Sequence, residues 1–509
     1  MSIRKIKQTH RLAALQHAAI ELIETADYKE LLSKIVNQAV ELMECDAASL
    51  YLKHDEKSLV FELAINLSVS VNFQKKVTPL SDTGIAAYTF KKNKCVRIND
   101  AYKIPKGSAF SFNPANDLKT GYRTHSVLSV PLVSSQGESL GVLQLINKKK
   151  SKKVFAPFSK QDETLSKSFA ALASASIEKA NLYHSIKDLF EGFIRASVSA
   201  IESRDPVTKG HSQRVSALSV ALAKNLNQFT PSQLDEVRVA ALLHDFGKIG
   251  VREEVLVKAK KLFRDEQREI RSRLDHFEAV AENRTLRALL ESIRLTKRIP
   301  SDLEMAAIDK QIRELKGNIE TIWGDILDLN EPTVMNEDRS EKLYRLRDIK
   351  FYTSKGILEP VLKESEIKLL SIKKGSLSES ERMMIENHVT QTYFFLKEIP
   401  WGHDLRNVPE IAHTHHEKLD GSGYPRGLKE KEIPTQARLM AICDIYDALV
   451  AADRPYKKAV PVEKALGILE QEAKNGQLDK KILKVFIESK VYEKVPTKEE
   501  LYQAIKKAG

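Results

Sequence analysis

The stretch HTHHEKLDGSGYP, residues 413–425, places three histidines within four positions and follows them with a loop rich in glycine. Free imidazoles have little structural reason to crowd together, whereas several of them beside acidic residues are typical of a metal site. The alternative is a polar turn that binds nothing. The choice depends on whether the rest of the chain supplies matching ligands.

Four other short stretches supply candidate ligands. They are RDPVTKGHSQRV with His211, LLHDFGKIG with His244, Asp245 and Lys248, ENHVTQTYF with His388, and AICDIYDAL with Asp444 and Asp447. Without His413 and Asp447, the chain offers five histidines and two aspartates: His211, His244, Asp245, His388, His415, His416 and Asp444. A mixed nitrogen and oxygen set suits iron, manganese or zinc better than calcium or magnesium.

The adjacent His244 and Asp245 gain their meaning from this set, since a His-Asp pair is common by chance. The pair follows the apolar run VAALL and precedes FGKIG, so we expect it near a helix end with both side chains free to converge. A carboxylate at that point can bridge two cations about 3.5 to 4 Å apart, as in two-metal hydrolases.

Together these stretches resemble the HD-GYP family of cyclic di-GMP phosphodiesterases, a branch of the HD-domain metal-dependent phosphohydrolases. The resemblance runs from about Phe190 to Val495, an inserted segment excluded. It rests on His244-Asp245 with Lys248, on HHEKLDGSGYP, and on IPTQAR (433–438), DIYDAL (444–449) and DRPYKKA (453–459). It implies an all-α domain that hydrolyses the 3′-5′ phosphodiester bond with a two-metal centre.

The resemblance also implies roles for single residues. One metal would be held by His211, His244, Asp245 and Asp444, and a second by His388, His415 and His416, with Asp245 as the bridge. Lys248 would lie against the scissile phosphate as a catalytic residue beside Asp245. The substrate would contact Gly423, Tyr424, Pro425, Arg438, Arg454 and Lys457. His413 matches no ligand and is expected behind the ligands or at the surface.

Iron and manganese are the metals that we expect, with two ions per chain. The resemblance also bears on the number of metals. Family members with three metals look to carry a Glu four residues before the histidine that corresponds to His211. Valine offers no lone pair, and that position is Val207 here.

Two other functions stay open. A catalytically weak receptor for cyclic di-GMP would be favoured by a missing ligand, but none of the seven is missing. The second alternative is a hydrolase of another cyclic dinucleotide. The Gly423-Tyr424-Pro425 loop favours cyclic di-GMP instead, by resemblance to the family.

The first part of the chain predicts a separate α+β domain. Helical spacing from about Gln16 to Met43 is followed by two strand pairs, AASLYLKHDEKSLVFELAIN (47–66) and SVLSVPLVSSQGESLGVLQLINK (126–148). From about residue 11 to 180 the chain resembles a GAF domain with an antiparallel sheet. Asn147-Lys148 and FSKQDE (158–163) fit a family pattern in which Lys and Asp form a structural latch. The ligand of the domain stays open.

Two further segments are helical in pattern. Residues 160–203 carry Leu165, Phe169, Leu172, Ile177, Leu182, Ile186, Leu189 and Phe193 near heptad spacing. This is typical either of a signalling helix that pairs in a homodimer or of a helix packed on its own domain. We expect a homodimer through the GAF domain and this linker helix. Residues 262–370 favour an inserted helical hairpin, which could contact a protein partner. We therefore divide the chain into a GAF domain (1–165), a linker helix (166–195) and an HD-GYP domain (196–509).

Composition limits the remaining classes of function. The net charge of +12 comes from scattered Lys and Arg without an aromatic platform, so a solvated basic surface is favoured over nucleic-acid binding. No apolar run reaches the ~18 residues of a membrane span. The N-terminus does not resemble a secretory signal, and Cys45, Cys95 and Cys443 form no CxxC pair. We expect a cytoplasmic protein.

Overall fold

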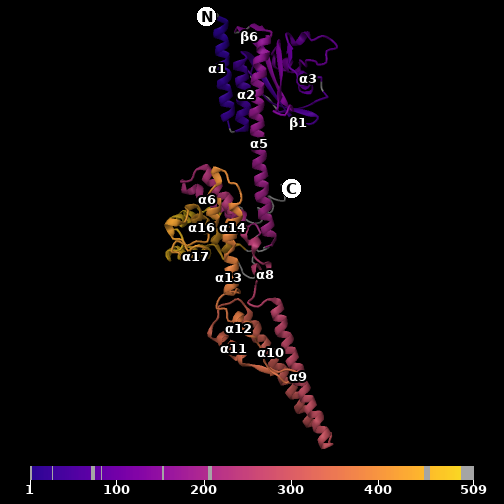
Figure 1. The fold of residues 1–509 in the computed structure, drawn as a ribbon, viewed down its shortest axis with the longest axis vertical. Helices are drawn as coiled ribbons and strands as arrows, with labels where there is room; N and C mark the ends of the chain where they lie inside the picture. Colours follow the sequence, from indigo (N-terminus) through magenta and orange to yellow (C-terminus); the bar gives the residue numbers. More distant parts are fainter. Residues whose placement is uncertain are drawn as a thin grey trace. The chain divides into compact units, whose positions relative to one another are not determined.

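The computed structural model describes residues 3–25, 27–69, 75–81, 83–151, 154–204, 209–451 and 459–493. The chain divides into two compact units, Met1–Glu191 and Gly192–Gly509. Helix α5, Lys160–Arg204, has residues in both units (Figure 1). Among the described helices, none is long and apolar enough to cross a membrane.

The N-terminal unit is an α+β domain built on one antiparallel sheet of order β3-β2-β1-β6-β5-β4, with β7 paired to β6. Its strands are β1 Cys45–Asp55, β2 Ser58–Asn66, β3 Lys76–Pro79, β4 Val96–Ile98, β5 Val127–Val133, β6 Ser139–Ser151 and β7 Val154–Ala156. Its helices besides α5 are α1 Ile3–Glu24, α2 Tyr28–Leu42, α3 Ile85–Lys92, η1 Ala101–Lys103 and α4 Ala115–Thr120. The predicted α+β class and both predicted strand pairs are confirmed.

The expected helix from Gln16 to Met43 is two helices, because Asp27 begins a new one. Its carboxylate accepts the backbone N–H of Glu30 at 2.8 Å and caps α2. The Lys148–Asp162 pair expected from the GAF resemblance is present: the Lys148 Nζ lies 3.3 Å from the Asp162 Oδ1, and both side chains are largely buried. This ion pair ties β6 to the first turn of α5.

Helix α5 changes character along its length. Phe169 and Ile177 lie in the core of the N-terminal unit. Further along, four apolar side chains spaced 4, 3 and 4 residues apart are exposed, at 61%, 58%, 75% and 49%: Leu182, Ile186, Leu189 and Phe193. Of the two interpretations of this helix, packing on its own domain holds for the first part. The exposed part keeps the spacing of a coiled-coil seam.

The C-terminal unit is largely helical. It comprises α6 His211–Leu226, α7 Pro231–Leu243, η3 Phe246–Gly250, α8 Glu253–Leu256, α13 Glu379–Glu386, α14 His388–Lys397, η4 His403–Leu405, α15 Val408–His413, η5 Glu430–Glu432, α16 Thr435–Val450, α17 Val462–Lys474, α18 Lys480–Glu488 and η6 Val491–Glu493. Helix α7 packs on α6, α16 on α6 and α15 on α14, so the segments that carry candidate ligands meet in one place.

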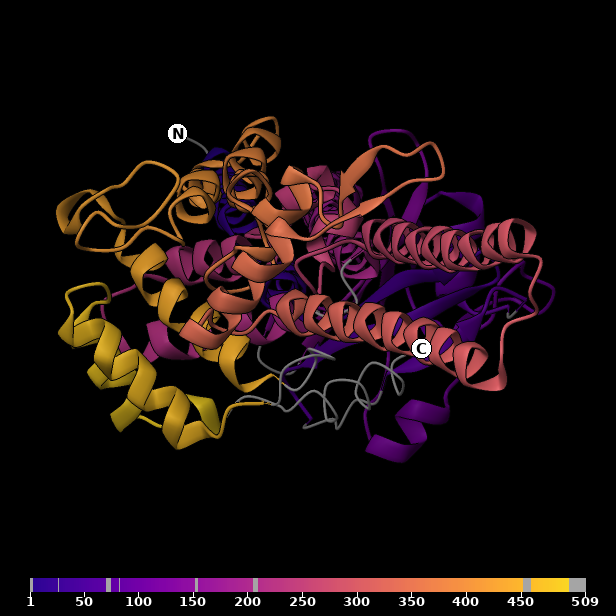
Figure 2. The ribbon, with the colours of Figure 1, turned by 90° about the horizontal axis from the view of Figure 1, so that it is seen from below.

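The insertion between α8 and α13 has a hydrophobic core of its own, which includes Leu274, Phe277, Ile319, Ile326 and Leu370. The expected hairpin is formed by α9 Arg264–Thr296 and α10 Asp302–Asn330, which run alongside each other (Figure 2). Helices α11 Glu337–Asp348 and α12 Glu364–Leu370 complete it.

The largely helical character predicted for this unit is confirmed, and the insertion adds a two-stranded sheet of β8 Lys350–Tyr352 and β9 Leu358–Pro360. Gly356, with a φ of 78°, makes the turn between its strands.

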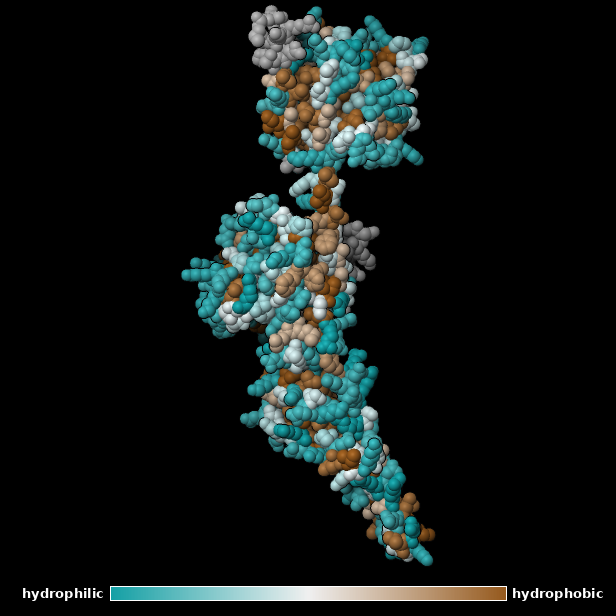
Figure 3. Space-filling view, viewed as in Figure 1, coloured by the Kyte–Doolittle hydropathy of each residue, from teal (hydrophilic) through white to brown (hydrophobic). Residues whose placement is uncertain are grey.

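Apolar side chains are exposed at the free end of the hairpin, brown in Figure 3. Leu295, Ile299 and Leu303 are 75%, 86% and 83% exposed there. A protein partner at the insertion stays a prediction. His276, the histidine of this segment, is exposed on α9.

Lys261, next to the insertion, predicts that the free energy of unfolding depends on pH. Its side chain is fully buried, and Nζ donates to the Leu370 carbonyl at 2.9 Å. Burial, with Arg339 nearby, lowers the pKa of Lys261 from 10.5 to about 8. Between these values the unfolded chain binds more protons than the folded chain, so the free energy of unfolding rises with pH, by up to about 3 kcal/mol.

Urea unfolding at pH 7.5 and pH 10 measures this gain. Lys261→Met has no group that titrates there, so its gain should be smaller than that of the wild type. Equal gains in both proteins would contradict the assignment.

Candidate metal centre

The seven predicted ligands converge from five segments of the C-terminal unit. His211 is the first residue of α6, His244 and Asp245 follow α7, His388 begins α14, His415 and His416 follow α15, and Asp444 lies within α16. Their ligand atoms form three overlapping triads, within each of which the atoms lie within 4.8 Å of one another. The triads are His388/His415/His416, His211/His244/Asp245 and His244/His415/Asp444.

The Asp245 carboxylate lies between two groups of histidines. Its Oδ1 is 3.1 Å from the Nε2 of His388, whereas its Oδ2 is 3.4 Å from the Nε2 of His244 and 3.9 Å from that of His211. The Lys248 Nζ lies 2.8 Å from the same Oδ2. Two oxygens facing two sets of nitrogens are the arrangement that a bridging carboxylate needs.

Asp444 faces the same interior from α16. Its Oδ1 lies 3.0 Å from the Nε2 of His211, and its Oδ2 lies 3.8 Å from the Nδ1 of His416. It is 6% exposed. Carboxylates are thus placed on two sides of the imidazoles, and they balance the charge that cations would bring.

Three of the imidazoles are oriented by their own backbone. The Nδ1 atoms of His244, His388 and His415 lie 2.8, 2.5 and 2.6 Å from the carbonyl oxygens of Ala241, Ile385 and Ala412. An Nδ1–H donated to a carbonyl leaves a lone pair on Nε2. All three Nε2 atoms are buried without a hydrogen-bond partner. His388 Nε2 is close to Asp245 but not in hydrogen-bonding geometry.

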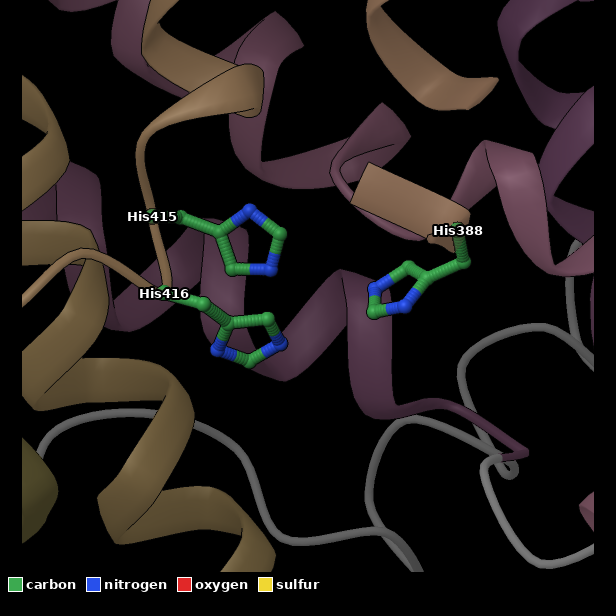
Figure 4. A group of neighbouring side chains, drawn as sticks. All are labelled: His388, His415 and His416. Atoms are coloured by element: carbon green, nitrogen blue, oxygen red, sulfur yellow. The ribbon is translucent and has the colours of Figure 1, made fainter. Parts of the chain in front are cut away.

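Figure 4 shows His388 facing His415 and His416. Buried nitrogens with unpaired lone pairs are costly unless an ion binds them. The donor set of imidazole nitrogen and carboxylate oxygen therefore fits first-row transition metals.

The pKa values favour the same interpretation. Burial lowers the pKa of His244 and His415, and it lowers that of His416 to about 4, so these rings are neutral near pH 7. Burial acts in the same direction on His211, but Asp444 and Asp447 outweigh it and raise its pKa to about 10. Neutral imidazole is the form that binds metals, so His211, unlike these three rings, would have to release a proton.

Sequence reasoning set Asp447 aside, yet it fixes His211. Its Oδ2 lies 2.8 Å from the Nδ1 of His211, the ring nitrogen that faces away from Asp444. Arg214 donates to both oxygens of Asp447, from Nε at 2.7 Å and from Nη2 at 2.9 Å. The signal was in the sequence, because Asp447 lies one turn after Asp444 on the same helix and shares its face.

The turn that carries Asp245 is held by Thr392 of α14. The Thr392 hydroxyl donates to the His244 carbonyl at 3.0 Å and accepts the Gly247 N–H at 2.8 Å. Asp245 itself has φ −96° and ψ 7°, the bridge region in which many active-site residues lie. Thr392 was not singled out from the sequence, since a lone threonine within a helix carries no signal.

The loop after the paired histidines folds back over them. Glu417, 4% exposed, accepts the backbone N–H groups of Arg426 and Leu428 at 2.7 and 2.8 Å and so closes the loop. A Cβ on Gly423 would lie 2.3 Å from the Lys418 nitrogen, so only glycine fits. Tyr424, followed by Pro425, places its ring 4.8 Å from the His416 ring, and burial raises its pKa. This loop therefore borders the centre.

The other predicted substrate contacts stay predictions. Arg438 donates to the carbonyls of Ile433 and Glu430 and lies 3.4 Å from Asp479, so it fastens the loop before α16. It would have to leave these partners to reach a substrate. Arg454 and Lys457 lie outside the described residues, as does Val207.

His413 is not at the surface, so that part of the expectation is wrong. It is 8% exposed and stacks on Tyr393 with ring centroids 4.5 Å apart. Neither of its ring nitrogens has a hydrogen-bond partner. Helix α15 ends at this residue, which packs it against α14.

Comparison with known proteins finds three family matches: a GAF domain over residues 27–177, and HD domains over residues 208–320 and 365–482. Among curated relatives, the 3′3′-cGAMP-specific phosphodiesterase 1 of Vibrio cholerae is 38% identical over 115 residues, 23% of this chain and 26% of that protein. The 3′3′-cGAMP-specific phosphodiesterase 3 of the same organism is 40% identical over 99 residues, 19% and 21% of the two chains.

A cyclic di-GMP phosphodiesterase of Thermotoga maritima is 42% identical over 107 residues, 21% of this chain and 28% of that protein. The chain thus spans about a quarter of the length of the curated relatives that it matches. The GAF match lies in the N-terminal unit and both HD matches lie in the C-terminal unit. The C-terminal unit contains the cluster of candidate ligands. The chain therefore matches a GAF domain in its first unit and HD domains in its second.

Proposed function

We propose that this chain is a metal-dependent phosphodiesterase that hydrolyses the 3′-5′ bond of cyclic di-GMP and is regulated by its GAF domain. The observation that carries the proposal is the convergence of five imidazoles and two carboxylates with three unpaired Nε2 atoms. A receptor without activity has no need of a complete ligand set, so catalysis is favoured over that alternative.

We propose that two ions of iron or manganese bind here, with Asp245 between them. When bound, such ions would neutralise a phosphodiester anion and would lower the pKa of water enough to supply hydroxide near neutral pH. His211, His244 and Asp444 would hold one ion, and His388, His415 and His416 the other. Lys248, whose Nζ lies 2.8 Å from Asp245 and whose side chain is 16% exposed, would stabilise the leaving oxygen or protonate it.

We propose cyclic di-GMP as the substrate. The second candidate is 3′3′-cGAMP. Two of the relatives are named for 3′3′-cGAMP, whereas others, among them that of Thermotoga maritima, are named for cyclic di-GMP. Both ligands share the phosphodiester ring, on which the metal centre would act, and they differ in one purine. The loop with Tyr424 borders the centre and would contact the bases.

Protein purified without oxygen and loaded with iron or manganese should be incubated with each cyclic dinucleotide, and the products resolved by chromatography. We expect a linear dinucleotide or mononucleotides from at least one of them. Binding of cyclic di-GMP without any product would favour the receptor, and faster turnover of 3′3′-cGAMP would reassign the substrate. Elemental analysis of the same sample tests the two-ion stoichiometry.

We also propose that the protein is a homodimer that pairs through the exposed seam of α5. Leu182, Ile186, Leu189 and Phe193 would bury their apolar surface against the same residues of a second copy. Sedimentation equilibrium should give a dimer for the wild type and a monomer for Leu189→Glu. Asn181→Glu, an exposed position outside the seam, is the control and should stay dimeric. A monomeric wild type would contradict the proposal.

A further inference from the structure

The last turns of α5 are built into the C-terminal unit. Ile194, Val198 and Ile201 share one helix face and are 1%, 2% and 5% exposed. Buried apolar side chains at this spacing fix the rotation of the helix about its axis. The polar residues that follow them, Glu202 and Arg204, are therefore held in place at the end of the helix.

Arg204 forms hydrogen bonds with the segment that follows Lys248. Its guanidinium donates to the carbonyl of Ile249 and, at 3.3 Å, to that of Val251. The Val251 N–H donates to the Lys248 carbonyl at 3.0 Å, and the Lys248 N–H donates to the Asp245 carbonyl at 2.9 Å. A continuous series of hydrogen bonds thus leads from Arg204 to the residue between the two histidine groups.

Glu202 contacts the other side of the centre. Its carboxylate accepts the backbone N–H of Gly210, the residue before His211. Gly210 has a φ of 77°, which lets the chain turn into α6. The end of α5 therefore touches the segment before His211 as well as the segment after Lys248.

Element η3 is held from two sides. At its start, Thr392 binds the Gly247 N–H, and at its end, Arg204 binds two carbonyls. The planar guanidinium of an arginine can donate to two neighbouring carbonyls at once, and a lysine ammonium replaces this geometry less well. Because α5 is continuous from Lys160, a rotation or axial shift of this helix would displace the guanidinium relative to both carbonyls.

We infer that Arg204 is a positioning residue that sets the place of Lys248 relative to Asp245, and that it is the point at which helix α5 acts on turnover. The inference deepens the proposed phosphodiesterase and rests on it for its kinetic test. Lys248 would act on the substrate, whereas Arg204 acts through Lys248 and touches no reacting atom.

The first test compares Arg204→Gln, Arg204→Lys and the control Arg195→Gln, an exposed arginine of the same helix. For Arg204→Gln we expect kcat to fall about 10-fold with KM and metal content unchanged, since small misplacements near a reacting group cost this much or more. Arg204→Lys should recover part of the loss, and Arg195→Gln should match the wild type. A loss of metal or an equal effect on KM would overturn the inference.

A double-mutant cycle identifies the route. If Arg204 acts through Lys248, Arg204→Gln should change kcat little in a Lys248→Ala background. Additive losses in the double variant would overturn the inference, because Arg204 would then act through another residue.

Hydrogen exchange of residues 246–251 tests the same contact without activity. Arg204→Gln should speed exchange of the Lys248 and Val251 amides, and Arg195→Gln should not. Unchanged exchange would overturn the positioning role. If the wild type hydrolyses neither cyclic dinucleotide, the proposed function fails, while this measurement still decides whether Arg204 holds η3.

Discussion

Asp245→Ala should abolish hydrolysis and release both metal ions. The carboxylate is 5% exposed and its two oxygens face different histidines, His388 on one side and His244 and His211 on the other. Without it, two cations would repel each other across a gap that nothing bridges. We expect turnover to fall by at least about 10³-fold, equivalent to about 4 kcal/mol of transition-state stabilisation.

The measurement is metal content by elemental analysis beside turnover of cyclic di-GMP. Asp235→Ala is a matched control, because Asp235 lies on α7, is 48% exposed in its side chain and pairs only with its helix neighbour Arg238 among the contacts described for it. It should keep metal and activity. Circular dichroism should show that both variants fold. An Asp245→Ala protein with the metal content and turnover of the wild type would show that the centre lies elsewhere.

The residues proposed as ligands could be selected from the sequence because their side chains carry the chemistry of metal ligands. His211, His388 and Asp444 stood out in short motifs, and the structure brings these segments together. Strand pairs followed from alternation and turn residues, as at the HDEKS turn and at Gly137. These features are local, so the sequence displays them directly.

The residues that support the ligands could not be predicted in the same way. Thr392 and Arg204 act through backbone groups of segments distant in sequence, and neither type of side chain signals such a contact. The sequence set His413 apart from the ligands, but only packing places it against Tyr393. The small sheet of β8 and β9 is short, and its strands lie among charged residues that favoured helix. Tertiary contacts decide all of these positions.

Gly247 shows how closely these contacts are fitted. A Cβ at this position would lie 1.9 Å from the carbonyl oxygen of His388 and 2.5 Å from the nitrogen of Thr392. Both atoms belong to the backbone of α14, so no side-chain rotation relieves the clash. Either η3 leaves α14 and loses the 2.8 Å bond from Gly247 to Thr392, or the start of α14 moves and takes His388 with it.

Gly247→Ala should therefore separate Asp245 and Lys248 from His388, with loss of metal and turnover and a fall in stability of about 3 kcal/mol or more. Gly250→Ala is the control within the same element, because a Cβ there would meet only the Gln391 Cγ, at 3.9 Å. It should bind metal and turn over substrate like the wild type. Thermal unfolding, metal content and turnover of the two variants, measured side by side, decide the matter: if Gly247→Ala behaves like Gly250→Ala, the close packing of η3 on α14 does not set the geometry of the centre.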